Sequence, residues 1–374
     1  MNEEIKYIIA LTRMRGIGSI RARLLIDTFG SAKNVFDADA KLLQKIPHVG
    51  QKLLEQRSDP TIFERTEKEV AFIQKNHIQP LIYGGEGYPK RLLDCPDAPA
   101  LLFHLGKTDL DSTHILSIVG TRNCSQYGRD MVKQLVSELK ATIPNILIVS
   151  GLALGIDISA HRAALENDMT TLGIVAHGLD RIYPAAHRNV ASEMIGQGGG
   201  LLTEYCTGTE PERGNFLARN RIIAGMADAI LVAESRDKGG SLTTASIALD
   251  YGRDVFAFPG RATDEKSQGC NRLIRTNRAG LITCADDLLE AMNWGNHGKN
   301  KKKAVQQSIN FEEENLSPIG RQIMDLLQER GDLRLSQLTD ALPDVDRAVM
   351  LEELLDLEMD DKIRACPGGL YQRK

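Results

Sequence analysis

Short apolar runs recur six times in the middle of the chain, and each is followed by glycine or proline and then by a helical pattern. They occupy residues 115–120, 145–151, 170–178, 200–205, 229–235 and 254–260. Strands that alternate with helices are joined by crossover connections, which produces a parallel sheet. The runs are nearly continuous rather than alternating, so both faces of the sheet should be covered, as in doubly wound folds. The sequence therefore predicts an α/β core with a Rossmann-like, mostly parallel sheet.

Different patterns flank this core on both sides. Residues 1–80 have helical periodicity with glycine-containing breaks, which predicts a small helical domain of the SAM or helix-hairpin-helix type. Residues 81–293 contain the predicted Rossmann-like domain, and residues 294–315 are polar and charged, as is typical of a linker. Residues 316–374 contain three helical stretches and a Pro-Gly-Gly turn, an order that fits a winged-helix domain. The chain is long enough to fold into several such domains.

The overall charge gives no direct indication of a nucleic-acid partner. Formal net charge is -4, so a surface that binds a polyanion must come from local clustering. The six cysteines are widely separated and form no Cys-x-x-Cys pair, which predicts neither a metal site nor a disulfide framework. The N-terminus lacks the basic start of a secretory signal, and no apolar stretch reaches the roughly 18 residues of a membrane helix. We therefore expect a cytoplasmic protein with no membrane partner.

The loops after the predicted strands are rich in glycine and arginine. In an open parallel sheet, ligands bind beyond the carboxyl ends of the strands. Glycine allows backbone amides to approach an anion, and a following helix N-terminus adds unpaired N–H groups. Residues 115–280 contain fourteen arginines and four lysines, and guanidinium groups can grip phosphate oxygens in pairs and stack on bases. The loops together predict a phosphate-binding edge, although packing alone is the alternative for any single loop.

The candidate DNA- and phosphate-binding residues come from these loops and from the helix after the fourth strand. They are Gly120, Thr121, Arg122, Gly151, Arg181, Arg188, Arg219, Asn220, Arg221, Lys238, Gly239, Gly240, Ser241 and Thr243. One of the two arginines at 219 and 221 could instead be a solvated or ion-paired surface residue of an amphipathic helix. Asp157 and His161 are four residues apart and could form an acid/base or metal pair. A helix cap and a buried histidine are the favoured alternative for that pair, and we identify no catalytic residue.

Six ordered blocks of sequence carry a resemblance to a known family. They read SIVGTRNCSQYG, IVSGLALGIDISAH, GLDRIYPAAH, RGNFLARNRIIAG, GGSLTTASIAL and FAFPG. In this order they resemble the DprA (Smf) family of DNA-processing proteins. The resemblance implies a dimeric cytoplasmic protein that binds and protects single-stranded DNA. It also implies loading of the RecA recombinase during natural transformation, without catalysis and without a cofactor.

The resemblance further assigns a DNA site to this sequence. The family's basic pocket maps onto Arg122, Arg219 to Arg221, Lys238, and Ser241 to Thr243. Arg181 and Arg188 are weaker candidates, because residues 185–187 read Ala-Ala-His where many relatives have lysine or asparagine. Leu154 stands where a common family form has arginine, so one possible phosphate-binding side chain is absent. Because single-strand binding sums many interactions, this difference should weaken binding rather than abolish it.

Two other functions compete with DNA binding. The stretch from Gly239 to Ser246 resembles the phosphate loop of nucleotide phosphoribohydrolases but contains no carboxylate, so a nucleotide-binding Rossmann enzyme of that type is the alternative. An adaptor is the third possibility, with the two flanking domains docking partners. The predicted recognition helix, residues 344–361, carries eight acidic residues and one arginine, so it should repel phosphates. We expect this domain to bind protein or to pack on the core.

Overall fold

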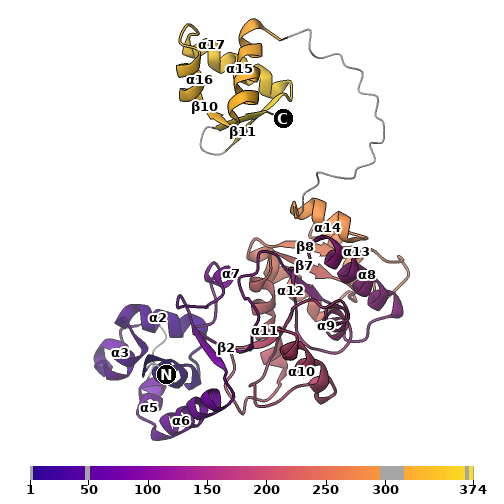
Figure 1. Ribbon diagram of the computed structural model, residues 1–374. Coiled ribbons are helices and arrows are strands. Elements are labelled where there is room, and N and C mark those ends of the chain that lie inside the picture. Colours follow the sequence, from indigo (N-terminus) through magenta and orange to yellow (C-terminus); the bar gives the residue numbers. More distant parts are fainter. Residues whose placement is uncertain (1–2, 47–50, 295–315, 367–369, 374) are drawn as a thin grey trace. The chain divides into compact units, whose positions relative to one another are not determined.

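The computed structural model describes residues 3–46, 51–294, 316–366 and 370–373 (Figure 1). By its internal contacts the chain divides into two compact units, Met1–Gly298 and Lys299–Lys374. Each unit has a hydrophobic core of its own. The predicted linker from residue 295 onward and the Pro-Gly-Gly turn at 367–369 lie outside the described residues. Within the described ranges, no helix is long and apolar enough to cross a membrane.

Nine strands in the described part of the first unit form one sheet, in the order β1-β2-β6-β5-β4-β3-β7-β8-β9. The strands are β1 Gln79–Ile82, β2 Leu101–Gly106, β3 Ile115–Val119, β4 Leu147–Ser150, β5 Thr171–Ile174, β6 Gly200–Thr203, β7 Ala229–Val232, β8 Asp254–Ala257 and β9 Gly280–Leu281. From β6 across to β9 all neighbours are parallel, whereas β1 and β2 form an antiparallel edge. The six predicted strands correspond to β3 through β8, which confirms the α/β core.

Helices cover both faces of this sheet, as the continuous apolar strands require. They are α8 Gln126–Thr142, α9 Ile156–Glu166, α10 Arg188–Gly196, α11 Arg213–Met226, α12 Gly240–Asp250, α13 Gln268–Arg275 and α14 Ala285–Met292. One face packs against α8, α9, α10 and α14, and the other packs against α11, α12 and α13. Every residue of β3, β4 and β7 is buried. The chain moves outward from β3 to β6 and then returns to β7 on the other side of β3.

The N-terminal helices form a hydrophobic cluster that includes residues of the antiparallel edge of the sheet. They are α1 Glu3–Arg13, α2 Ser19–Phe29, α3 Ala32–Asp37, α4 Ala40–Leu43, α5 Gln51–Arg57 and α6 Pro60–Lys75. Their hydrophobic cluster includes Leu101 and Phe103 from β2. The predicted boundary between residues 80 and 81 falls inside β1. The short helix α7, Lys90–Leu93, lies between β1 and β2 in the chain.

The second unit contains three helices and a small antiparallel sheet. Its described elements are α15 Pro318–Arg330, β10 Leu333–Arg334, α16 Leu335–Ala341, α17 Arg347–Met359, β11 Ile363–Cys366 and β12 Leu370–Arg373. The three strands pair in the order β10-β12-β11. Helix α17 begins three residues after the predicted start near Asp344, because Asp346 caps it by accepting a hydrogen bond from the Ala348 amide at 2.8 Å.

Candidate nucleic-acid interface

The sheet reverses its strand order between β3 and β7. The chain leaves β3 toward β4 on one side and later returns to β7 on the other. Loops that follow these two strands therefore diverge, and the crevice between them is the expected ligand site of an open α/β sheet. A cleft of about 640 Å³ lies there, and both loops line it together with one face of α11. The fold thus concentrates the site at one point rather than along the whole sheet edge.

The loop after β3 is fixed on both sides by backbone hydrogen bonds. The Thr121 amide donates to the Glu234 carbonyl at 2.8 Å, and the Ile156 amide donates to the Thr121 carbonyl at 3.2 Å. A Cβ atom on Gly120 would lie 2.5 Å from Ile156 Cγ1, so only glycine fits. This rigid loop holds the exposed Arg122 at the cleft, where its guanidinium carbon lies 4.9 Å from the centre of the Phe216 ring.

A buried carboxylate joins the two loops beneath the cleft. Glu234 accepts hydrogen bonds from the Ser125 amide at 2.7 Å and from the Ser125 hydroxyl. Gly128, in the first turn of α8, leaves room for it, because a Cβ there would lie 2.6 Å from the Glu234 carboxyl carbon. Glu234 therefore ties the start of α8 to the end of β7. No sequence pattern indicates this role, since a lone glutamate after a strand has no characteristic spacing.

The loop after β7 brings cationic side chains and an open helix N-terminus to the cleft. Arg236 and Lys238 are exposed and line it, and Gly239 precedes the first residue of α12 without a side-chain cap. The first amides of α12 are therefore available to an anion. The hydroxyl of Ser241 also lines the cleft and donates to the Ser235 hydroxyl at 3.0 Å. Thr243 is exposed but lies outside the cleft lining.

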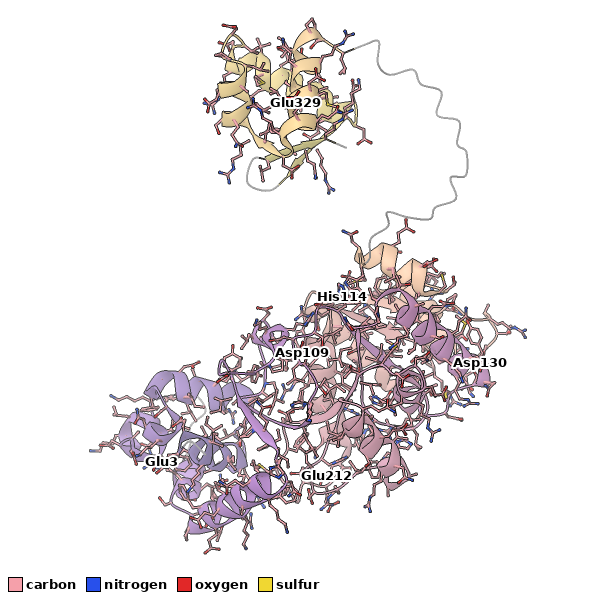
Figure 2. The ribbon with its side chains drawn as sticks, viewed as in Figure 1. Glu3, Asp109, His114, Asp130, Glu212 and Glu329 are labelled. Carbon is pink, nitrogen blue, oxygen red and sulfur yellow. The ribbon has the colours of Figure 1, made fainter. Side chains whose placement is uncertain are left out.

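Helix α11 forms the third wall, and its periodicity decides which residues reach the cleft. Arg213, Phe216, Leu217 and Asn220 line the cleft. These residues recur at intervals of three or four, so they share one helix face. The helix begins directly after Glu212, which is labelled in Figure 2. The Phe216 ring also lies 5.9 Å from the ring of Tyr183, which is exposed.

Arg219 is buried in the floor of the cleft, and its guanidinium binds groups of the protein itself. Its Nη1 donates to the carbonyl of Gly151 at 2.7 Å and to that of Ile174. A Cβ on Gly151 would lie 2.1 Å from this nitrogen, which explains the glycine there. Burial lowers the pKa of Arg219 to about 10, with the charge of Asp157 opposing this shift. The structure therefore places Arg219 and Gly151 in the support of the cleft floor.

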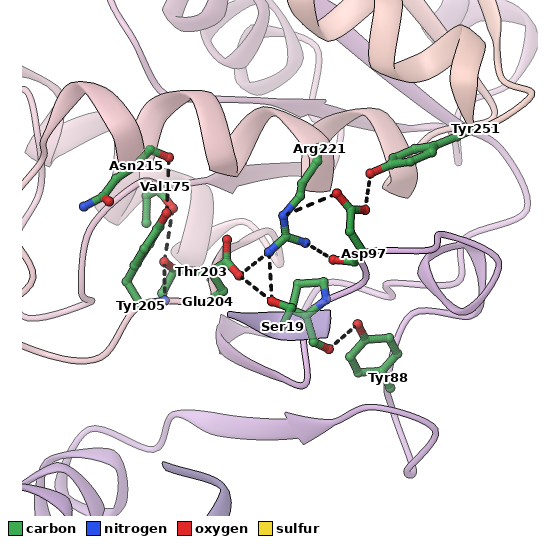
Figure 3. Close-up of polar contacts among 11 residues, drawn as sticks. Ser19, Tyr88, Asp97, Val175, Thr203, Glu204, Tyr205, Asn215, Arg221 and Tyr251 are labelled. Carbon is green, nitrogen blue, oxygen red and sulfur yellow. Dashed lines mark hydrogen bonds and ion pairs between the residues drawn. The ribbon is translucent and has the colours of Figure 1, made fainter. Parts of the chain in front are cut away.

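Arg221 faces away from the cleft and is neutralised (Figure 3). Its guanidinium forms an ion pair with Glu204 and donates to the Asp97 carbonyl at 2.6 Å and to the Ser19 hydroxyl at 3.1 Å. Burial raises the pKa of Glu204, and the positive charge of Arg221 opposes that shift. These residues line a second cavity of about 560 Å³ beside the start of α2. The structure does not bring Arg221 to the predicted DNA site.

The two weaker candidates also lie outside the cleft. Arg181 forms ion pairs with Asp180, at 3.1 Å, and with Glu210. Both carboxylates raise its pKa above the usual range, so its charge is compensated within the protein. Arg188 is exposed at the first position of α10 and is not part of the cleft lining.

Asp157 and His161 do not form an acid/base pair with access to solvent. Both are buried on the first turns of α9. The Thr171 hydroxyl donates to the Ile148 carbonyl, so it accepts from His161 Nδ1 at 2.7 Å. Burial above all, together with the charges of the nearby His187 and Arg219, lowers the pKa of His161 to about 3. The histidine is therefore neutral and structural, and within the described residues no cluster of potential metal ligands occurs.

Three cationic or aromatic residues that line the cleft were not among the predicted site residues. They are Arg213, Phe216 and Arg236. The first two could have been found from the sequence, because both share the i, i+3, i+7 spacing with Asn220 on one helix. Arg236 could not have been distinguished from its neighbours, because it lies in a loop. A loop has no periodicity that indicates which side chains point into the cleft.

Comparisons with known proteins identify the family of this chain. The sequence profile of the family described as DNA recombination-mediator protein A matches residues 79–293. Protein Smf of Synechocystis is 34% identical over 299 residues, which covers 78% of this chain and 73% of that protein. DNA processing protein DprA of Streptococcus pneumoniae is 42% identical over 202 residues, which covers 54% of this chain and 70% of the relative.

Two solved structures also resemble the chain. The structure of DNA processing protein A from Streptococcus pneumoniae has a TM-score of 0.61 at 33% identity, covering 76% of this chain and 97% of that one. A structure of DNA processing protein A from Helicobacter pylori, concerned with its single-stranded DNA binding mode, has a TM-score of 0.52 at 31% identity. It covers 58% of this chain and 95% of that one. The chain therefore belongs to the DNA recombination-mediator protein A family, whose relatives are named DprA or Smf.

Proposed function

We propose that the chain binds single-stranded DNA in the cleft between the loops after β3 and β7. The observation that carries this proposal is the convergence of Arg122, Arg213, Arg236 and Lys238 from three separate elements on one cleft. Among the described residues, no carboxylate forms an ion pair with Arg122, Arg213 or Lys238, and Arg236 has one exposed contact, with Glu265 at 3.4 Å. Cationic groups without internal partners are available to phosphate oxygens.

The aromatic side chains at the cleft favour a single strand over a duplex. Unpaired bases can leave the backbone and stack on protein rings, whereas the bases of a duplex are already stacked on one another. Phe216 lines the cleft and Tyr183 is adjacent to it, so two aromatic rings accompany the phosphate-binding groups. We therefore assign the backbone to the cationic side chains and to the start of α12, and at least one base to Phe216. The single-stranded DNA binding of the Helicobacter pylori relative supports this assignment.

The proposed site keeps most of the predicted residues and omits others. Gly120, Thr121, Arg122, Asn220, Lys238, Gly239, Gly240 and Ser241 line the cleft and remain in it. Arg213, Phe216 and Arg236 are added. Arg181, Arg188, Arg221 and Thr243 lie outside the cleft lining. Arg219 also lines the cleft, where it is buried, and its hydrogen bond to the carbonyl of Gly151, which lies outside the lining, supports the floor.

A catalytic role in nucleotide hydrolysis has little support. Asp157 is the one carboxylate among the described residues that line the cleft, and it is buried, with Arg219 and Arg122 acting on its charge. Residues 239–246 offer amides but contain no carboxylate, and Asp237 before them is paired with Arg272 at 2.5 Å. We therefore propose a binding protein rather than an enzyme. Its cytoplasmic location, its assembly as a homodimer, its loading of RecA in transformation and the winged-helix assignment of the second unit are parts of the same proposal.

A competition assay tests the proposal. Fluorescence anisotropy follows a labelled oligothymidylate of about 20 nucleotides, long enough to span one binding site. The competitors are an unlabelled single strand, a duplex of the same length and a nucleoside monophosphate. We expect the single strand to compete at a concentration at least about tenfold lower than the duplex, and affinity to fall steeply with salt.

The matched pair of variants is Arg122→Ala, inside the cleft, and Arg188→Ala, an exposed arginine outside it. The first should weaken binding by about tenfold, and the second should leave it unchanged. Equal competition by the duplex, or equally weakened binding in both variants, would contradict the proposal. Release of free base from the monophosphate at turnover rates would instead favour the hydrolase.

A further inference from the structure

Helix α17 carries a second apolar face that its own unit does not cover. Its first apolar face, formed by Met350, Leu354 and Leu357, is buried against α15 and β11. Leu351, Leu355 and Met359 follow at intervals of four residues and are 43%, 57% and 78% exposed. Residues four apart lie one above another on a helix, so these three side chains form a continuous ridge. We call Leu351, Leu355 and Met359 the α17 ridge.

The ridge is unusual within its unit. In the described part of the second unit, the large apolar side chains that remain exposed all belong to α17. Single exposed apolar residues are normal on protein surfaces, but an adjacent group of long side chains marks an interaction site. Helix α17 begins after a side-chain cap and already fills the core with its other face. The ridge is therefore not required for folding of the unit.

Charge beside the ridge limits what can cover it. Glu352 and Asp356 are exposed and follow the ridge residues Leu351 and Leu355 by one position, so they form an acidic border along it. No basic residue occurs between Ala348 and Asp361. Nucleic acid is repelled by such a border. A second copy of the helix is also disfavoured, because a twofold contact would oppose the same carboxylates.

We infer that the α17 ridge docks a basic amphipathic helix of another protein. Such a partner presents apolar side chains every three or four residues to Leu351, Leu355 and Met359, and its flanking lysines or arginines face Glu352 and Asp356. Apolar contact supplies most of the affinity, while the charges select the partner and speed its association. This surface is independent of the cleft in the first unit, so DNA and the partner can each be tested alone.

The test uses the full-length protein and a labelled synthetic helix of about 18 residues, or about five turns. The probe has leucine at every third or fourth position and lysine elsewhere. A second probe keeps the leucines and replaces every lysine with glutamate, and a third keeps the composition but scrambles the pattern. We expect the lysine probe to bind, its affinity to fall with salt, and the other two probes to bind at least about tenfold more weakly.

The variant Leu351→Gln/Leu355→Gln/Met359→Gln removes the ridge, and Val349→Gln is its control. Val349 is 39% exposed on the same helix, and Glu352 and Asp356 lie between it and the ridge. The triple variant should bind the lysine probe at least about tenfold more weakly with an unchanged circular dichroism spectrum, and Val349→Gln should bind as the wild type does. Equal binding by the triple variant, or no binding by the wild type, would overturn the inference. Dissociation of a wild-type oligomer in the triple variant would assign the ridge to a second copy and also overturn it.

Discussion

Helix α11 separates two cavities, and Arg122 in the first and Arg221 in the second have opposite surroundings. On one side, the switch-point cleft contains Arg122, Arg213 and Lys238, for which the described residues offer no ion-pair partner. On the other side, Arg221 is paired with Glu204 and bonded to Asp97 and Ser19. The cations in the cleft can replace water with phosphate oxygens. Arg221 has instead already replaced water with a carboxylate of the protein. Composition alone cannot distinguish these two roles.

The consecutive residues Arg219, Asn220 and Arg221 show why. Successive positions on a helix turn by about 100°, so three neighbours cannot share one face. Asn220 lines the cleft, Arg219 is buried in the floor of the same cleft, and Arg221 lines the second cavity. Arginines on one helix should therefore differ in what they stabilise. Four sets of variants test this difference.

The largest expected effect is on stability, from Arg219→Met. The substitution removes the donor to Gly151 and Ile174 and leaves Asp157 buried without its nearest guanidinium. Loss of one partner from a buried charged group costs about 4 kcal/mol in the free energy of unfolding. Equilibrium urea unfolding measures it, with the exposed Arg213→Met as control and an expected change below about 0.5 kcal/mol. A loss below about 1 kcal/mol for Arg219→Met would show that this arginine is not part of the structural support.

A somewhat smaller loss in the free energy of unfolding, about 3 kcal/mol, is expected for Arg221→Met, because the Glu204 side chain, which is only 13% exposed, would lose its ion-pair partner. Replacing both residues, in Arg221→Met/Glu204→Leu, should recover at least about 1 kcal/mol of this loss. Without Arg221 the pKa of Glu204 should rise further, since burial already raises it. The deficit should therefore shrink at acidic pH, where Glu204 is protonated. A double variant that is no more stable than the single one would argue against a neutralised pair.

The next prediction concerns the effect of pH on the stability of the fold, through the buried His161. Burial lowers the pKa of His161 from 6.5 to about 3. The unfolded chain takes up a proton as pH falls through 6.5 and the folded chain does not, so this contribution to stability is lost on acidification. Between pH 7 and pH 5, His161→Gln should lose about 2 kcal/mol less stability than the wild type. Parallel pH profiles for the two proteins, from urea unfolding, would contradict a neutral buried His161.

The smallest effect tests the aromatic wall of the cleft. Phe216→Leu keeps an apolar side chain on α11 but removes the ring beside Arg122 and Tyr183. Stacking of one base on an aromatic side chain contributes about 1 kcal/mol, so affinity for single-stranded DNA should fall by about fivefold. The slope of affinity against salt should not change, because every phosphate-binding group remains in place. A reduced slope would place Phe216 in support of Arg122 rather than in contact with a base.

The sequence predicted the core better than it predicted the site. The six strands β3 to β8 were found because each is a buried apolar run between turn residues. The antiparallel strands β1 and β2 were not, since the pattern around them does not alternate with helices. In the site, loop residues such as Arg122 and Lys238 could be placed by strand order alone. The direction of Arg221 and the pairing of Arg181 with Glu210 depend on interactions between distant segments, which no local pattern contains.

The central claim is that Arg122 in the cleft binds phosphate and that Arg221 in the second cavity does not. The salt dependence of DNA binding tests this claim most directly. Affinity for a labelled single-stranded oligonucleotide is measured over a range of salt concentrations for wild type, Arg122→Ala and Arg221→Met, at a temperature where all three are folded. Removing one cation that neutralises a phosphate of a single strand lowers the slope of log affinity against log salt by about 0.7. We predict this reduction for Arg122→Ala and a wild-type slope for Arg221→Met. An unchanged slope for Arg122→Ala, or a reduced slope for Arg221→Met, would contradict the assignment of the polyanion to the switch-point cleft.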